Sequence, residues 1–162
     1  MTIRDATEAE FDHLARLWYE GWKEAHASIL PEALAQHRTL ASFRHRLHVE
    51  AQHLRVAGPV GQPTGMCIVK NDELNQLYVS AGARGTGLAG MLLSDGEARL
   101  SRNGTQTAWL ACAIGNVRAA RFYEKKGWRL AGEEPILLDT PDGPFELEVW
   151  RYEKVLRPEV PC

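Results

Sequence analysis

The sequence predicts an α/β fold: a single domain with a mixed, mostly antiparallel sheet, one central parallel strand pair and helices on both faces. Apolar residues alternate between helical spacing and short strand-like runs, in the order β-α-α-β-β-β-α-β-α-β-β. Short turns join most neighbouring strands, whereas a helix separates the strands at 73–80 and 107–114, so that pair should be parallel. The 162 residues suit one domain. We expect the domain at 1–156 and a short tail at 157–162.

The N-terminal part is predicted to contain a short strand at Ile3 and two helices. Thr7 and Glu10 have the S/T-x-x-E spacing of a capping box. The apolar residues that follow at helical spacing are Phe11, Leu14, Ala15, Trp18, Trp22 and Ala25. A helical turn is expected at Pro31. The second helix carries Leu40, Phe43 and Leu47 on one side.

The middle of the chain is predicted to form an antiparallel meander with strands at 53–57, 64–70 and 73–80. A glycine-rich loop at 82–87 leads into a helix at 88–102, which Asn103 and Gly104 should end. The apolar run at 107–114 is typical of a strand buried on both faces. A helix from Asn116 to Gly127 follows, and then two strands at 128–138 and 145–155, joined by a loop at 139–144.

Composition excludes several classes of protein. The net charge of −2 and the pI near 6.3 give no pull towards nucleic acid or a membrane surface. No apolar stretch approaches the roughly 20 residues of a membrane span, and no signal peptide is seen, so a cytoplasmic location is expected. The three cysteines, Cys67, Cys112 and Cys162, lack disulfide or zinc spacing. His45 and His48 lie three apart, but no further ligand completes a set, so no metal is expected.

The first motif with chemical meaning is a glycine-rich turn between a strand and a helix. It consists of Arg84, Gly85, Thr86, Gly87, Leu88 and Ala89. Such a turn points successive N–H groups into one concavity at a helix N-terminus, which suits a diphosphate. The same stretch also reads G-x-G-x-x-G, at Gly85, Gly87 and Gly90, as in dinucleotide-binding proteins. That alternative expects an acidic residue in the next strand, and 108–113 has none.

The second motif begins at Asn116, and with the first it resembles the GNAT acetyltransferases. The phosphate loop Q/R-x-x-G-x-G/A of that family is matched by Arg84, Gly87 and Ala89. Its later signature, N-x-x-A-x-x-F-Y-x-x-x-G-F/W, is matched by Asn116, Ala119, Phe122, Tyr123, Gly127 and Trp128. The order of elements agrees along nearly the whole chain, while the N-terminal helices agree only loosely.

The resemblance implies how acetyl-CoA, the co-substrate, would bind. The backbone of Leu77 and Val79 would pair with pantetheine as an added strand, with the Val79 N–H facing the thioester oxygen. The diphosphate would lie on the amides from Arg84 to Ala89. Asn116 would reach pantetheine from the other side, in the motif that also includes Ala119 and Phe122. The Tyr123 hydroxyl would lie near the sulfur and protonate the leaving thiolate.

The function implied is transfer of acetyl to a primary amine by direct attack through a tetrahedral intermediate, with a homodimer as an option for assembly. Glu73 and Glu24 are candidate bases, and neither is assigned. Alternatives are a catalytically silent acyl-CoA-binding or regulatory module and a dinucleotide-binding oxidoreductase. The acceptor is unidentified; acids around its expected site favour a cationic one, namely Glu20, Glu24, Glu32, Asp139 and Asp142.

Overall fold

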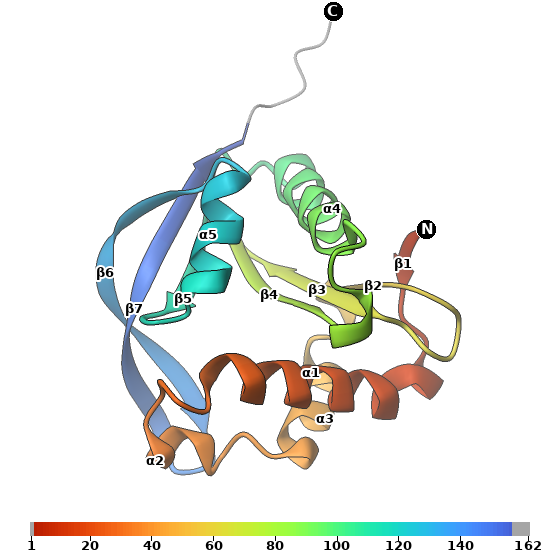
Figure 1. The fold of residues 1–162 in the computed structure, drawn as a ribbon, viewed down its shortest axis with the longest axis horizontal. Coiled ribbons are helices and arrows are strands. Elements are labelled where there is room, and N and C mark those ends of the chain that lie inside the picture. The colour runs from red at the N-terminus through yellow and green to blue at the C-terminus, as the bar shows by residue number, and fades with distance from the viewer. Residues whose placement is uncertain (1, 157–162) are drawn as a thin grey trace, which may run out of the picture.

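A computed structural model describes residues 2–156, which form one seven-stranded sheet with strand order β1-β2-β3-β4-β5-β7-β6 (Figure 1). The strands are β1 (Ile3–Asp5), β2 (Leu54–Ala57), β3 (Gly65–Lys70), β4 (Glu73–Val79), β5 (Thr107–Ala113), β6 (Arg129–Thr140) and β7 (Gly143–Val155). Among these described strands only β4 and β5 are parallel neighbours. The predicted α/β class and the predicted parallel pair are both confirmed.

Helices cover both faces of the sheet, as predicted. They are α1 (Phe11–His26), α2 (Glu32–Ala35), α3 (Leu40–Val49), α4 (Leu88–Arg102) and α5 (Val117–Lys125), with short 3-10 turns at Glu8–Glu10, Ala51–His53 and Ala81–Ala83. In Figure 1, α1 and α3 lie below the sheet, and α4 and α5 lie above it. None of the helices in residues 2–156 is long and apolar enough to cross a membrane.

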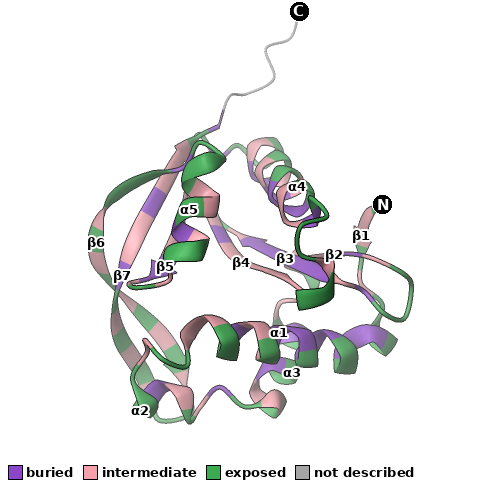
Figure 2. Ribbon diagram, in the orientation of Figure 1, coloured by how far each residue is buried: buried purple, intermediate pink, exposed green. Residues whose placement is uncertain are grey.

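Each helical layer has its own core, visible as the buried segments of Figure 2. On one face Trp18 of α1 and Phe43 of α3 pack with ring centroids 5.0 Å apart, over buried side chains of β2 and β3. On the other face the apolar side of α4 packs on the sheet; its buried leucines are Leu88, Leu92, Leu93 and Leu100. The sheet lies between the two cores. Burial of these side chains fixes the position of each helix on its face of the sheet.

The predicted capping box is present and is part of a larger polar cluster around Glu10. The Thr7 N–H donates to Glu10 Oε1 at 2.9 Å, and the turn runs directly into α1. The Glu10 carboxylate, which is fully buried, also accepts two hydrogen bonds from Arg4, at 2.9 and 2.7 Å, and one from the Gly61 N–H. Hydrogen bonds from Arg4 lower the pKa of Glu10 to about 2.

We expect this cluster to make stability fall on the acid side. Because the folded pKa lies below the unfolded value of 4.5, the stabilisation is complete above pH 4.5 and is lost as the pH falls towards 2. With screening at the partly exposed Arg4, the loss should be about 2 kcal/mol. Urea unfolding between pH 7 and 3 would measure it. Glu10→Gln should be less stable at pH 7 and lack this pH dependence, whereas the control Glu8→Gln should behave as wild type.

Two predictions about strands were wrong. The loop expected at 139–144 is much shorter, because β6 and β7 continue until Thr140 pairs with Gly143, leaving only Pro141 and Asp142 between them. The strand expected to be buried on both faces is only partly so. Ala108, Leu110 and Cys112 of β5 are buried, whereas Trp109 and Ala111 on the other face are half-buried, and the Arg151 guanidinium lies 4.6 Å from the Trp109 ring centroid. The tail expected at 157–162, which includes Cys162, lies outside the described residues.

Candidate active site

The parallel strands β4 and β5 are joined at one end and separate towards the other. Their Cα register contains only Glu73 opposite Trp109, and the Trp109 N–H donates to the Asp72 carbonyl at 3.1 Å. The far edges of both strands are occupied, since β4 pairs with β3 and β5 pairs with β7 along their lengths. The edge of β4 that faces β5 is therefore open beyond Glu73.

The open edge presents backbone groups of the two residues that sequence analysis selected. The Ser80 N–H donates to the Thr64 carbonyl at 2.8 Å, which is the β3 side of the strand. Since backbone groups alternate sides along a strand, the N–H and C=O of Leu77 and Val79 point the other way, towards β5. An extended ligand lying in the gap can pair with them as a further strand.

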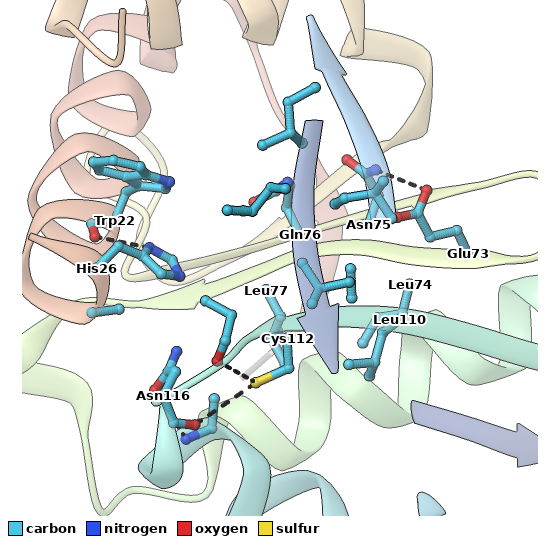
Figure 3. Close-up of a pocket in the computed structure, with 18 of the residues that line it drawn as sticks. Trp22, His26, Glu73, Leu74, Asn75, Gln76, Leu77, Leu110, Cys112 and Asn116 are labelled. Carbon is cyan, nitrogen blue, oxygen red and sulfur yellow. Dashed lines mark hydrogen bonds between the residues drawn. The ribbon is translucent and has the colours of Figure 1, made fainter. Parts of the chain in front are cut away.

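The gap holds a cavity of about 400 Å³ (Figure 3). Trp22 and His26 of α1 line one side, and Leu77 of β4 and Cys112 of β5 line another. Gly21 lets α1 lie this close to the sheet, because a Cβ at that position would be 2.6 Å from Cδ1 of Tyr78. Helix α1 runs without interruption through Gly21 to His26.

Tyr123 reaches this cavity from α5. Its ring is edge-on to Phe122, at 5.2 Å between centroids, and to Trp128, at 6.1 Å. Burial raises the pKa of the Tyr123 phenol. The hydroxyl therefore stays protonated across the neutral range, the state a proton donor needs. Phe122 is not among the described residues that line the cavity; it packs against Tyr123 and into the core.

Asn116 lies at the start of α5 and has two contacts there. Its side-chain oxygen accepts from the Ala119 N–H at 3.3 Å, which caps the helix, and its backbone carbonyl accepts from the Cys112 thiol at 3.7 Å (Figure 3). Asn116 and Ala119 both line the cavity. The helix cap uses the carbonyl oxygen of the Asn116 side chain, so its NH₂ group remains available as a donor.

The glycine-rich loop lies beyond the open end of β4, at the N-terminus of α4. Gly85 and Gly87 have φ of +79° and +83°, and a Cβ at either position would meet nothing within 4 Å. Gly87 is the N-cap of α4, Leu88 is buried beneath it, and Ala89 is half-buried. Thr86 donates its hydroxyl to the Ala83 carbonyl at 2.5 Å, which holds the turn. The outer face of the loop is free to receive a diphosphate.

Arg84, the remaining loop residue, has an ion-pair partner that sequence analysis missed. Its guanidinium donates to both carboxylate oxygens of Glu24 on α1, at 2.8 and 2.5 Å. Arg118 of α5 lies 3.7 Å from the same carboxylate. The hydrogen bonds from Arg84 lower the pKa of Glu24. A carboxylate so stabilised is a poor proton acceptor, which argues against Glu24 as the base.

Glu73, the other candidate base, has the opposite environment. It is half-buried at the end of β4 where the two strands meet, and it lines the cavity. Burial raises its pKa, against a smaller effect of the hydrogen bond that Asn75 Nδ2 donates at 3.1 Å (Figure 3). A carboxylate with a raised pKa beside a cavity is suited to accept a proton.

The predicted absence of a metal site concerned His45 and His48. Among residues 2–156 no group of His, Cys, Asp and Glu is placed to hold a metal ion. His48 instead packs edge-on against Phe11, with ring centroids 4.8 Å apart.

Comparison with known proteins defines the class to which this fold and site belong. The model of the acetyltransferase (GNAT) family matches residues 11–128. The chain belongs to that family, as the two sequence motifs predicted. The dinucleotide-binding alternative is thereby set aside.

Individual relatives agree with this assignment. Uncharacterized N-acetyltransferases of Mycobacterium bovis and Mycobacterium tuberculosis are 38 % identical over 66 residues, which is 41 % of this chain. The chain spans about 42 % of the length of these curated relatives.

Solved structures match nearly the whole fold. A GCN5-related N-acetyltransferase of Rhodopseudomonas palustris has a TM-score of 0.73 at 18 % identity, over 96 % of this chain and 95 % of that one. PaiA N-acetyltransferase of Thermoplasma acidophilum, solved in complex with coenzyme A, has a TM-score of 0.68 at 18 % identity, over 95 % and 98 %. YncA of Salmonella typhimurium, solved with acetyl-CoA, has a TM-score of 0.65 at 16 % identity, over 100 % and 97 %.

Proposed function

We propose that this protein transfers the acetyl group of acetyl-CoA to a primary amine. The observation that carries the proposal is the open edge of β4, where the backbone N–H groups of Leu77 and Val79 lie on the β5 side, beside a cavity that Leu77 and Tyr123 line. Such an edge can bind the pantetheine arm through backbone hydrogen bonds. The diphosphate would then lie on the loop from Arg84 to Ala89, at the N-terminus of α4.

The chemical roles follow from these positions. A neutral amine attacks the acetyl carbonyl, and the N–H of Val79 stabilises the negative charge that builds on the oxygen. The tetrahedral intermediate collapses and releases the CoA thiolate, which takes the proton of the Tyr123 hydroxyl. Glu73 lines the same cavity at the other end of β4, and accepts the proton that the amine loses through a chain of waters along the cavity. Leu77 and Asn116 hold the pantetheine arm, with Ala119 beside them.

Binding of acetyl-CoA is the first test. At 100 times its dissociation constant the ligand should stabilise the fold by about 2.7 kcal/mol, and so raise the melting temperature. Differential scanning fluorimetry with acetyl-CoA, CoA and NAD would measure this. A melting temperature that millimolar acetyl-CoA leaves unchanged would contradict the proposal.

Release of free thiol with a panel of amines then separates an enzyme from a silent acyl-CoA-binding module, since the module would bind acetyl-CoA without turnover. The homodimer and the cytoplasmic location stay predictions from the sequence.

A further inference from the structure

Two arginine side chains, Arg38 and Arg46, line the same cavity, and the reaction proposed above uses neither of them. Arg38, between α2 and α3, has only 7 % of its surface exposed. Arg46 of α3 lies with its guanidinium carbon 4.4 Å from the ring centroid of Trp18. We call Arg38 and Arg46 the arginine pair.

The arginine pair has no carboxylate partner among the described residues. Arg38 donates to the backbone carbonyl of Asp139 at 3.3 Å, and neither guanidinium makes an ion pair within residues 2–156. Burial lowers the pKa of Arg46 to about 10, and the charge of Arg38 acts in the same direction. Both side chains remain cationic at neutral pH. Like charges on a buried Arg38 and a half-buried Arg46 are unfavourable without an anion, so the site is suited to receive one.

The other charged groups of the cavity do not neutralise the pair. Glu50 pairs with Lys70 at 2.8 Å and its charge also acts on Arg46 without an ion pair, and Glu73 accepts its hydrogen bond from Asn75. The side chain of Asp139 is exposed; its charge reaches both arginines only at longer range. Burial lowers the pKa of His26, so that ring is neutral near pH 7.

The cavity that the arginine pair lines also has apolar and aromatic side chains in its wall, among them Trp22, Leu34, Tyr78, Leu138 and Leu147. Guanidinium groups bind carboxylate and phosphonate through paired hydrogen bonds. We propose that the acetyl acceptor is a small amine that also carries an oxyanion group, a carboxylate or a phosphonate, bound by Arg38 and Arg46. Its apolar skeleton would lie against Trp22 and Leu34. This inference rests on the proposed acetyl transfer.

The acids that favoured a cationic acceptor are placed elsewhere. Glu24 is bound to Arg84, and Asp142 is exposed and 3.2 Å from His37. Glu20 and Glu32 are exposed and do not line the cavity. Asp139 is the one acid of that group beside it, and Arg38 contacts its backbone.

Product analogues test the inference without requiring turnover. Calorimetry on the CoA-saturated protein would compare N-acetylglycine, N-acetyl-L-leucine and N-acetyl-L-phenylalanine with their carboxamides, and with the phosphonate analogue of N-acetylleucine. At least one oxyanion probe should bind about tenfold or more tighter than its amide, since hydrogen bonds to a charged group are the stronger kind. The carboxylate and phosphonate arms show which oxyanion fits.

Two matched variants locate the effect. Arg46→Met keeps the length and packing over Trp18, and should reduce the preference for the oxyanion, which the Arg38→Met, Arg46→Met double variant should lose, while the affinities for amide and CoA change little. Arg44→Met removes an exposed charge from the same helix, one that pairs with Asp12, and should keep the preference.

Three results would overturn the inference while acetyl transfer stands: equal binding of acid and amide, no binding of any oxyanion probe to protein that binds CoA, or an oxyanion preference that survives in the Arg38→Met, Arg46→Met double variant. Failure of the protein to bind CoA would instead reject the proposed function on which the inference depends.

Discussion

Tyr123→Phe should lower kcat by about 10², because the CoA thiolate loses its proton donor while the ring and its packing remain. The edge-on contacts with Phe122 and Trp128 involve the ring, not the hydroxyl, so the fold should be unaffected. Affinity for acetyl-CoA should also stay near that of wild type. Thiol release under saturating acetyl-CoA, with any accepted amine and across a range of pH, would measure the change.

The matched control is Tyr152→Phe. Tyr152 is also buried, but its hydroxyl donates to Glu124 at 3.0 Å and it does not line the cavity. That variant should keep its turnover and lose only a hydrogen bond. Wild-type turnover of Tyr123→Phe at every pH would show that the hydroxyl has no part in the reaction.

Gly87→Val should weaken acetyl-CoA binding by about tenfold to a hundredfold, which corresponds to one lost hydrogen bond to a charged group. A Cβ at this position meets no protein atom, so it would project from the outer face of the loop, where the diphosphate is expected. The positive φ also strains a β-branched residue, which should lower the melting temperature somewhat.

Gly82→Val controls for bulk in the same loop. A Cβ at Gly82 also meets nothing within 4 Å, and Gly82, unlike Gly85 and Gly87, does not have a positive φ. It should leave CoA affinity near that of wild type. If a folded Gly87→Val protein bound CoA normally in calorimetry, the diphosphate would not be held at this loop.

The order of elements was predictable because the apolar residues that face the core recur at helical spacing in the helices and form short runs in the strands. Thr7 and Glu10 predicted the start of the first helical segment, and Asn116 predicted the start of α5, because helix caps are local features of the sequence. The extent of β6 and β7 was not predictable, because Pro141 and Asp142 are enough for the turn and their neighbours still pair.

The site was predictable where it depends on backbone and not where distant side chains meet. The loop glycines and the strand before them are contiguous in sequence. The ion pair of Glu24 with Arg84 joins residues 60 apart, and no periodicity marks it. Arg46 did leave a signal: it follows Phe43 by three residues, which places it on the buried face of α3. An arginine on an apolar helix face indicates a charge that is partly removed from solvent.

Helix α1 contacts two places at once: Glu24 binds Arg84 of the phosphate loop, and Trp22 and His26, two residues earlier and later, line the cavity. A diphosphate that binds Arg84 competes with Glu24 for the same guanidinium. Any shift of α1 that follows would also move Trp22 and His26 in the cavity wall. The two substrates would then influence each other's affinity, and by thermodynamic linkage the influence is equal in both directions. Initial-rate kinetics should therefore show a dissociation constant for each substrate that depends on the concentration of the other.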